Sequence, residues 1–150
     1  MKKIYFKKAV SSFAIVAILV LISLILTKNS MQFYKNLAKP DLAPPPIIFP
    51  IVWTILYSVI TITLYRFYDN KDIKKIIIIN LIINIIWPIL FFRFELLFLS
   101  IIWLILLIVS TLVMLLKLFK EDKIYTFLNL PYLLWTFFAL YLNIIIFVLN

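Results

Sequence analysis

The sequence predicts an all-α integral membrane protein, a bundle of five transmembrane helices formed by a single domain over residues 1–150. Two observations carry this prediction. First, 66% of the residues are hydrophobic and only 14% are charged, whereas a soluble domain has about a quarter of its residues charged. Second, the apolar residues fall into five runs, each close to the roughly 20 residues that cross a bilayer. These spans and their short connections use the whole chain, so no soluble domain fits.

The first two spans flank the longest connection. The first covers about residues 9–27 after a basic start, and its length favours a retained helix over a cleaved signal peptide. A linker over 28–46 follows, and five of the seven prolines lie between Pro40 and Pro50. The second span covers about 47–68. Pro50 falls in its first turn, where a missing N–H group costs nothing.

The last three spans follow at short intervals. The third covers about 76–94 with Pro88 inside it, and Arg93 and Glu95 mark a tight turn into the fourth, over about 96–119. The fifth covers about 124–149, and Pro131 near its start is placed to kink it.

Basic residues sort between the two sides of the predicted bundle. Eleven Lys and Arg residues lie at the N-terminus and in the second and fourth connections, and four lie on the opposite side. By the positive-inside rule the N-terminus is cytoplasmic and the C-terminus and the proline-rich linker lie outside. The same placement explains the net charge of +9 without nucleic-acid binding. Usage rich in Ile, Lys and Asn suggests an AT-rich bacterial genome, and hence a bacterial cell membrane.

The residue inventory excludes several kinds of chemistry. The chain has no Cys and no His, which removes disulfides, zinc sites, the usual haem ligands and His-based acid–base catalysis. All six acidic residues fall in predicted loops or at span ends. Because proton-coupled carriers and ion pumps keep an ionisable residue at membrane depth, this pattern argues against both.

Uncharged polar residues do lie deep within the spans, in three stripes with helical spacing. The stripes comprise Asn80, Asn84, Trp87 and Phe91; Trp53, Tyr57 and Thr61; and Asn129, Tyr132, Thr136 and Asn143. One interpretation is packing, since buried amides and hydroxyls bond between helices. The other is an aromatic pocket with a few polar groups. Trp53 and Trp87 belong to these stripes and Trp135 lies beside one, whereas Trp103 has no polar neighbour and is expected to be lipid-facing or packed.

Three motifs resemble one known family. The first loop reads Phe33-Tyr34, then KPDLAPP from Lys39, then IVWTILY from Ile51. The third span has Asn84, Trp87 and the Phe91-Phe92 pair, and the fifth reads PYLLWTFFALYLN from Pro131. In this order and spacing the sequence, over about residues 5–149, resembles the TspO/MBR family, which includes the translocator protein and bacterial tryptophan-rich sensory proteins.

The resemblance implies that the proline-rich loop lids a pocket inside the bundle. Such pockets take tetrapyrroles, sterols or drug-like aromatic molecules, and a porphyrin (protoporphyrin IX or haem) is the leading candidate, bound or transported with no required cofactor. The implied ligand-binding residues are Tyr34, Lys39, Pro44, Pro45, Trp53, Tyr57, Asn84, Trp87, Phe91, Tyr132, Trp135, Phe138, Ala139, Leu142 and Asn143. Lys35 and Lys39 at the pocket mouth are placed to pair with propionates, and no catalytic or metal-binding residue is expected.

Departures from the family pattern bear on the alternatives. Leu42 stands where the family has a lid tryptophan, Phe33 begins the Trp-Tyr pair, and the cholesterol motif after Asn143 is missing. A light- and oxygen-dependent porphyrin-degrading enzyme is the first alternative, but Ile144 replaces the second aromatic residue that it needs. The other alternative is a sensory membrane protein that acts through a partner. Besides the bilayer and a small ligand, the resemblance implies that a homodimer can form, and with no glycine such a dimer cannot use GxxxG contacts.

Overall fold

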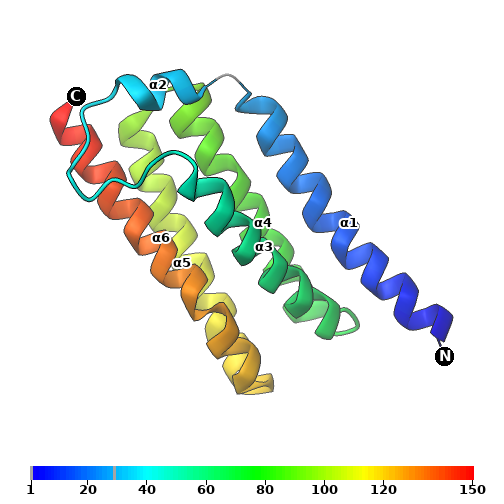
Figure 1. Cartoon of the computed structure of the whole chain (residues 1–150). Coiled ribbons are helices and arrows are strands. Elements are labelled where there is room, and N and C mark those ends of the chain that lie inside the picture. Colours follow the sequence, from blue (N-terminus) through cyan, green and yellow to red (C-terminus); the bar gives the residue numbers. More distant parts are fainter. Residues whose placement is uncertain (1, 29) are drawn as a thin grey trace.

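The computed structural model describes residues 2–28 and 30–150 and confirms an all-helical membrane protein (Figure 1). Within these residues, five helices are long and apolar enough to cross a membrane, with a π-helical turn (η1) continuing the third. The elements are α1 (Lys2–Leu26), α2 (Met31–Asn36), α3 (Ile48–Arg66), α4 (Lys71–Pro88), η1 (Ile89–Arg93), α5 (Leu97–Glu121) and α6 (Lys123–Leu149).

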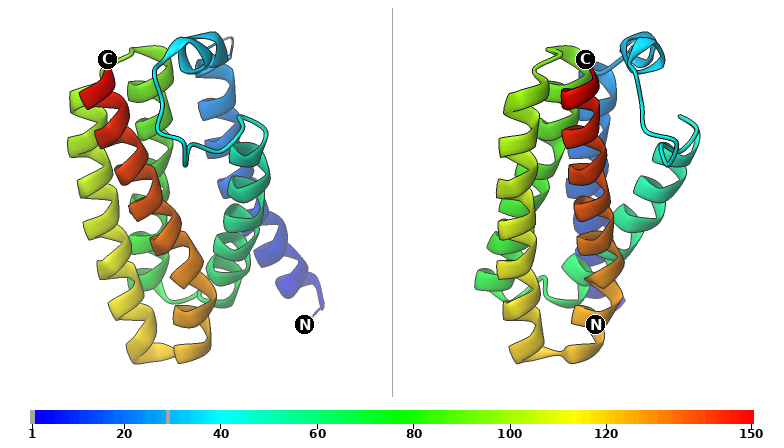
Figure 2. Two further views of the ribbon diagram at one scale, coloured as in Figure 1. Left: turned by 60° about the vertical axis from the view of Figure 1, so that its left-hand side comes forward. Right: turned by 90° about the vertical axis from the view of Figure 1, so that its left-hand side faces the viewer.

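The five long helices form a closed ring in the order α1, α3, α6, α5, α4 (Figure 2). The most extensive contacts join α5 to α6 and α4 to α5, and α1 lies at one side against α3 and α4. The axis is filled by large apolar side chains, with Leu64, Leu81, Leu104 and Leu107 fully buried. The start of α1 and the end of α6 lie at opposite ends of the bundle.

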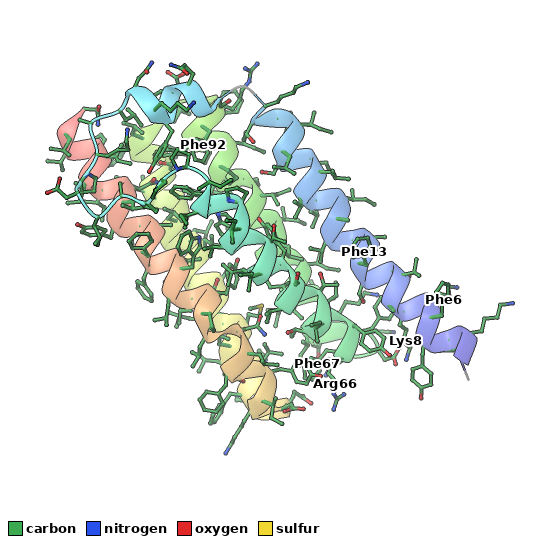
Figure 3. The ribbon with its side chains drawn as sticks, in the orientation of Figure 1. Phe6, Lys8, Phe13, Arg66, Phe67 and Phe92 are labelled. Atoms are coloured by element: carbon green, nitrogen blue, oxygen red, sulfur yellow. The ribbon has the colours of Figure 1, made fainter. Side chains whose placement is uncertain are left out.

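Polar residues fix several helix ends. The side chain of Asn70 accepts from the Ile73 N–H group at 3.1 Å, so α4 begins at Lys71, five residues before the predicted span. Asp122 caps α6 by accepting from Ile124 N–H at 3.0 Å. Lys8 pairs with Asp69, which connects α1 to the α3–α4 loop. Lys8 and Arg66 lie at the end of the bundle opposite to Phe92 (Figure 3).

The sequence suggested one continuous helix for the third span, but the structure divides this span into two parts. It is α-helical to Pro88 and continues as the π-helical turn η1, closed by a bond from Phe94 N–H to the Ile89 carbonyl at 3.0 Å. Proline lacks an N–H group and its ring clashes with the carbonyl four residues earlier, here that of Asn84. The α-helix nevertheless continues through Pro88, and the wider turn that follows it carries Phe91 and Phe92.

The predicted tight turn between the third and fourth spans contains a left-handed residue. Glu95 has φ of 58°, a conformation that is costly for any residue with a Cβ atom. We expect Glu95→Gly to raise the free energy of unfolding by about 0.5–1 kcal/mol, after allowing for the added flexibility of glycine in the unfolded chain. Unfolding by sodium dodecyl sulfate would measure it. The control is Glu95→Ala, which keeps a Cβ atom and should give no such gain; an equal gain in both variants would contradict the argument.

Candidate functional site

An apolar cavity of about 230 Å³ lies between α1, α3 and α4, towards the α2 end of the bundle. It is called the main cavity below. Its walls comprise Val20, Ser23 and Leu24 on α1, with Thr27 directly after it; Phe49, Pro50, Trp53, Thr54 and Tyr57 on α3; Asn84, Trp87 and Pro88 on α4; and Phe92 on η1. The cavity therefore combines aromatic and aliphatic walls with a few polar groups, as ligand sites usually do.

One wall of the main cavity is a group of aromatic rings. Trp53 and Tyr57, one helical turn apart on α3, are stacked with centroids 5.4 Å apart and an interplanar angle of 26°. Trp87 lies 6.2 Å from Trp53, and the buried ring of Tyr132 meets Trp53 edge-on at 6.3 Å. The stripe spacing on α3 and α4 thus placed three of the predicted residues, Trp53, Tyr57 and Trp87, at one wall.

A chain of buried hydrogen bonds begins at this wall. The Tyr57 hydroxyl donates to Asn84 Oδ1 at 2.6 Å, and Asn84 Nδ2 donates to the Tyr132 hydroxyl at 2.9 Å. Asn84 is 1% exposed and Tyr132 is 1% exposed. These residues come from α3, α4 and α6, so the hydrogen bonds at the cavity wall connect three helices.

The polar chain continues to α5. The Tyr132 hydroxyl donates to Asn80 Oδ1 at 2.8 Å, and Asn80 Nδ2 donates to the hydroxyls of Ser110 and Thr111 at 2.6 and 3.0 Å. Thr111 in turn donates to the carbonyl of Leu107 at 2.8 Å. The full path therefore crosses α3, α4, α6 and α5.

Other deep amides serve packing, which was one of the two interpretations of the stripes. Asn129 donates to Thr63 at 2.8 Å and Asn143 donates to Ser100 at 2.9 Å, in each case between helices. Trp103 is half-buried and donates to the Ile83 carbonyl at 2.8 Å. Packing therefore accounts for Asn80, Asn129 and Asn143, while Asn84 both packs and lines the cavity.

A second group of predicted residues surrounds a much smaller space of about 10 Å³, called the small void below. It is lined by Tyr34, Phe49, Trp87, Phe91, Phe92, Ala139, Leu142, Asn143 and Ile146. Phe49, Trp87 and Phe92 line both spaces and form the partition between them. The predicted site is thus divided: Trp53, Tyr57 and Asn84 face the main cavity, and Tyr34, Phe91, Ala139, Leu142 and Asn143 face the small void.

The remaining predicted residues lie outside both linings. Trp135 on α6 contacts Phe49 edge-on at 6.0 Å and Phe138 at 5.3 Å. Pro44 and Pro45 lie in the linker that passes between the end of α6 and the start of α3 (Figure 2). Ile144 is 41% exposed on α6 and also lines neither space.

The linker is held at two points. The Asn150 side chain pairs with the backbone of Ala38, accepting from its N–H group and donating to its carbonyl, both at 3.0 Å. The Lys39 ammonium donates to the carbonyls of Tyr34, Lys35 and Leu37 at 2.9, 3.1 and 2.6 Å. Lys39 therefore caps the end of α2, and all three of its protons are directed at backbone oxygens instead of at the main cavity.

Tyr34 anchors α2 to the bundle. Its ring is 2% exposed and packs edge-on against Phe49 at 5.5 Å and Phe92 at 6.0 Å. Burial raises the pKa of its hydroxyl, because the phenolate would lose solvation. The hydroxyl of Tyr34 and the indole N–H groups of Trp87 and Trp135 are buried without a partner among the described residues.

The α1 wall was missed by sequence reasoning. Val20, Ser23, Leu24 and Thr27 line the main cavity, but the first span was predicted as a retained helix with no site residue on it. The signal was present: Ser23 and Thr27 are one helical turn apart in an otherwise apolar run. Phe49 was missed because it precedes the aromatic stripe of the second span.

A side groove of about 400 Å³ continues the main cavity between α1 and α3. The two spaces share Val20, Thr54 and Tyr57. Below these residues the groove is lined by Phe13, Val16, Ala17, Ser58, Thr61 and Ile62. An occupant of the main cavity can therefore extend along α1 and α3 without displacing the partition.

Comparison with known proteins gives one consistent result. The model of the TspO/MBR family matches residues 11–149. A tryptophan-rich protein TspO from Archaeoglobus fulgidus is 32% identical over 130 residues, which cover 83% of this chain and 84% of that protein. Proteins of the same name from Bacillus cereus and Chlorobaculum tepidum are 27% and 29% identical, covering 86% and 82% of this chain and 88% and 82% of those proteins.

Proposed function

Since this chain belongs to the TspO/MBR family of membrane proteins, we propose that it binds a flat, apolar, aromatic ligand inside its helix bundle, foremost a porphyrin or related tetrapyrrole. The observation that carries the proposal is the main cavity, where the stacked pair Trp53–Tyr57 and the indole of Trp87 flank an open space. Aromatic contacts contribute about 1 kcal/mol each beyond the burial of area. A flat ring system gains from several of them at once.

Size supports a ligand that uses both the main cavity and the side groove. The main cavity holds about 230 Å³, and sites for drug-sized ligands are roughly 300–1,000 Å³. The side groove adds a space of about 400 Å³ that begins at Tyr57. A tetrapyrrole would therefore place one edge against Trp53 and Trp87 and extend between α1 and α3.

The linker supports a role as a lid at the α2 end of the bundle. Prolines reduce the conformational entropy that the linker loses when it orders. Its contacts with Asn150 and the end of α2 hold it in place. The distribution of basic residues supports a location of this end outside the cell, with the start of α1 in the cytoplasm.

Titration with protoporphyrin IX tests the proposal. The detergent-purified protein is titrated in the dark while tryptophan fluorescence is followed. We expect saturable quenching at micromolar ligand and a Kd about fivefold weaker in Trp53→Phe, which loses part of the stacked wall. Trp103→Phe removes a tryptophan that does not line the main cavity, so it should leave Kd unchanged. Quenching that does not saturate, or equal losses in both variants, would reject a ligand site at this wall.

A further inference from the structure

Four polar side chains meet at the end of the bundle where α1 begins, and they are called the corner site below. Tyr68 lies in the connection between α3 and α4 (Figure 1), and the Lys74 ammonium lies 3.6 Å from the centroid of its ring. Hydrogen bonding to Ser11 and Lys74, together with the charge of Lys7, lowers the pKa of the Tyr68 hydroxyl, because donors and cations stabilise the phenolate. The corner site thus joins α1, the connection and the first turn of α4.

The two lysines of the corner site are not neutralised by nearby acids. Asp69 pairs with Lys8. Asp72 lies two residues before Lys74 in the first turn of α4, a spacing that directs the two side chains to different faces. Among the residues that the structure describes, neither Lys7 nor Lys74 forms an ion pair. The corner site therefore has two uncompensated positive charges beside two hydroxyl groups.

Basic residues at this end of the bundle are also explained by the orientation of the spans. A lysine that serves only this purpose is solvated and needs no particular neighbour. In the corner site, however, two cations and two hydroxyl groups from three separate segments lie around one aromatic ring. Several donors directed at one point are the usual requirement for holding a phosphate group.

The depth of the corner site in the membrane indicates where such a phosphate group would come from. Tyr68 lies between two apolar spans, Ile48–Arg66 and Lys71–Arg93, so its ring is at the membrane surface. Tyrosine rings favour this level, where lipid headgroups are found. A phospholipid is therefore the source of phosphate that the position favours.

An apolar surface continues from the corner site along both helices. On α1, Ile18 and Ile22 follow Ser11 by two and three helical turns, so they share its face, and both are exposed. On α4, Ile82 follows Lys74 by about two turns and is also exposed. At 1.5 Å per residue the distance from Ser11 to Ile22 is about 16 Å, close to the roughly 15 Å of hydrocarbon in one leaflet. The polar end and the aliphatic length match a phospholipid headgroup and its acyl chain.

We propose that the corner site binds the phosphate group of an anionic phospholipid, with Lys7 and Lys74 as its cationic contacts, and that this lipid bridges α1 to α4. The inference does not depend on the proposed function, because the corner site and the main cavity share no residue. Both bridged helices nevertheless form walls of the main cavity. A headgroup held between them would support the position of α1 at the side of the ring.

Native mass spectrometry of the detergent-purified protein tests the proposal, because it counts bound lipid molecules and gives a Kd for each lipid. Phosphatidylglycerol is compared with phosphatidylcholine of the same acyl chains, whose choline cation offsets the phosphate charge. We expect phosphatidylglycerol to bind wild type about tenfold more tightly, which corresponds to about 1.4 kcal/mol. Lys7→Gln and Lys74→Gln should each weaken phosphatidylglycerol binding about fivefold, since one lysine near an anionic headgroup contributes about 1 kcal/mol.

Two further variants serve as controls. Lys117→Gln removes one positive charge from the last turns of α5, outside the corner site, and should bind both lipids as wild type does. Tyr68→Phe keeps the ring under Lys74 and removes the hydroxyl, so it should weaken phosphatidylglycerol binding about threefold, the effect of one hydrogen bond. Circular dichroism confirms that each variant keeps its helices.

The other outcomes would overturn the inference. If wild type bound the two lipids equally, or if Lys117→Gln lost as much affinity as Lys7→Gln and Lys74→Gln, the basic end would attract lipids without a defined contact. If inorganic phosphate at millimolar concentration displaced phosphatidylglycerol, the site would belong to a soluble anion and the lipid assignment would be rejected. Failure of protoporphyrin IX to bind, with phosphatidylglycerol bound as expected, would reject the proposed function and leave this inference standing.

Discussion

Replacing Tyr132 with phenylalanine is expected to lower the free energy of unfolding by about 2 kcal/mol, although the ring and its packing stay in place. The hydroxyl accepts from Asn84 and donates to Asn80, at 2.9 and 2.8 Å. Both amides are 1% exposed, so each would lose a partner that neither water nor another described side chain replaces. An unsatisfied buried polar group costs about 1–3 kcal/mol, and values within membranes fall towards the lower end.

The measurement is the unfolding of detergent-solubilised protein by sodium dodecyl sulfate, followed by circular dichroism. Tyr141→Phe is the control: this tyrosine lies on the same helix but is 41% exposed, so its change should be within about 0.5 kcal/mol of zero. If Tyr132→Phe were no more destabilising than Tyr141→Phe, the polar chain would not contribute to holding α3, α4, α5 and α6 together.

Trp87→Ala is expected to have the largest effect, a loss of about 3–5 kcal/mol, the usual range for truncation of a buried tryptophan. The indole is 4% exposed and contacts Trp53, Phe91 and Phe92 at centroid distances of 6.0–6.2 Å. It also separates the main cavity from the small void. Its removal would join the two spaces, and neighbouring rings held by Tyr34 and Phe49 cannot collapse fully into the gap.

The same unfolding assay measures this loss, with Trp103→Ala as the matched truncation. Trp103 is half-buried and has one hydrogen bond, to the Ile83 carbonyl, so a loss of about 1–2 kcal/mol is expected. Equal losses in the two variants would show that the partition has no special part in stability. A larger stability gain on adding fluorene to Trp87→Ala than on adding it to wild type would demonstrate that the enlarged space takes an apolar occupant.

Much of the fold could be predicted because bilayer length and hydropathy constrain helices strongly. The five apolar runs gave the five long helices, and the left-handed Glu95 lies in the predicted turn. The π-helical turn after Pro88 could not be predicted, since a proline indicates a local conflict but not how neighbouring side chains resolve it. The short helix α2 was missed because six residues carry too little periodicity to stand out within a linker.

Part of the site could also be predicted, because helical spacing identifies residues that share one face of a helix. Regular spacing on the second and third spans identified Trp53, Tyr57, Asn84 and Trp87, which all line the main cavity. Spacing within one helix contains no information on which neighbour it meets, so the contribution of α1 and the separate small void around Ala139 and Leu142 were not foreseen. Lys39 was expected to face a ligand, but its ammonium group donates hydrogen bonds to three nearby backbone carbonyls.

The position of α1 at one side of the ring has a consequence for biosynthesis. This helix is made before α3 and α4, the two helices on which it packs, so it must reside in the lipid without them. Its apolar stretch is more hydrophobic and less buried than that of α3, which makes it stable alone in the bilayer. By contrast, α3 to α6 share buried amides and hydroxyls that need one another. We expect these four helices to assemble first, with α1 docking last and closing the main cavity as it does so.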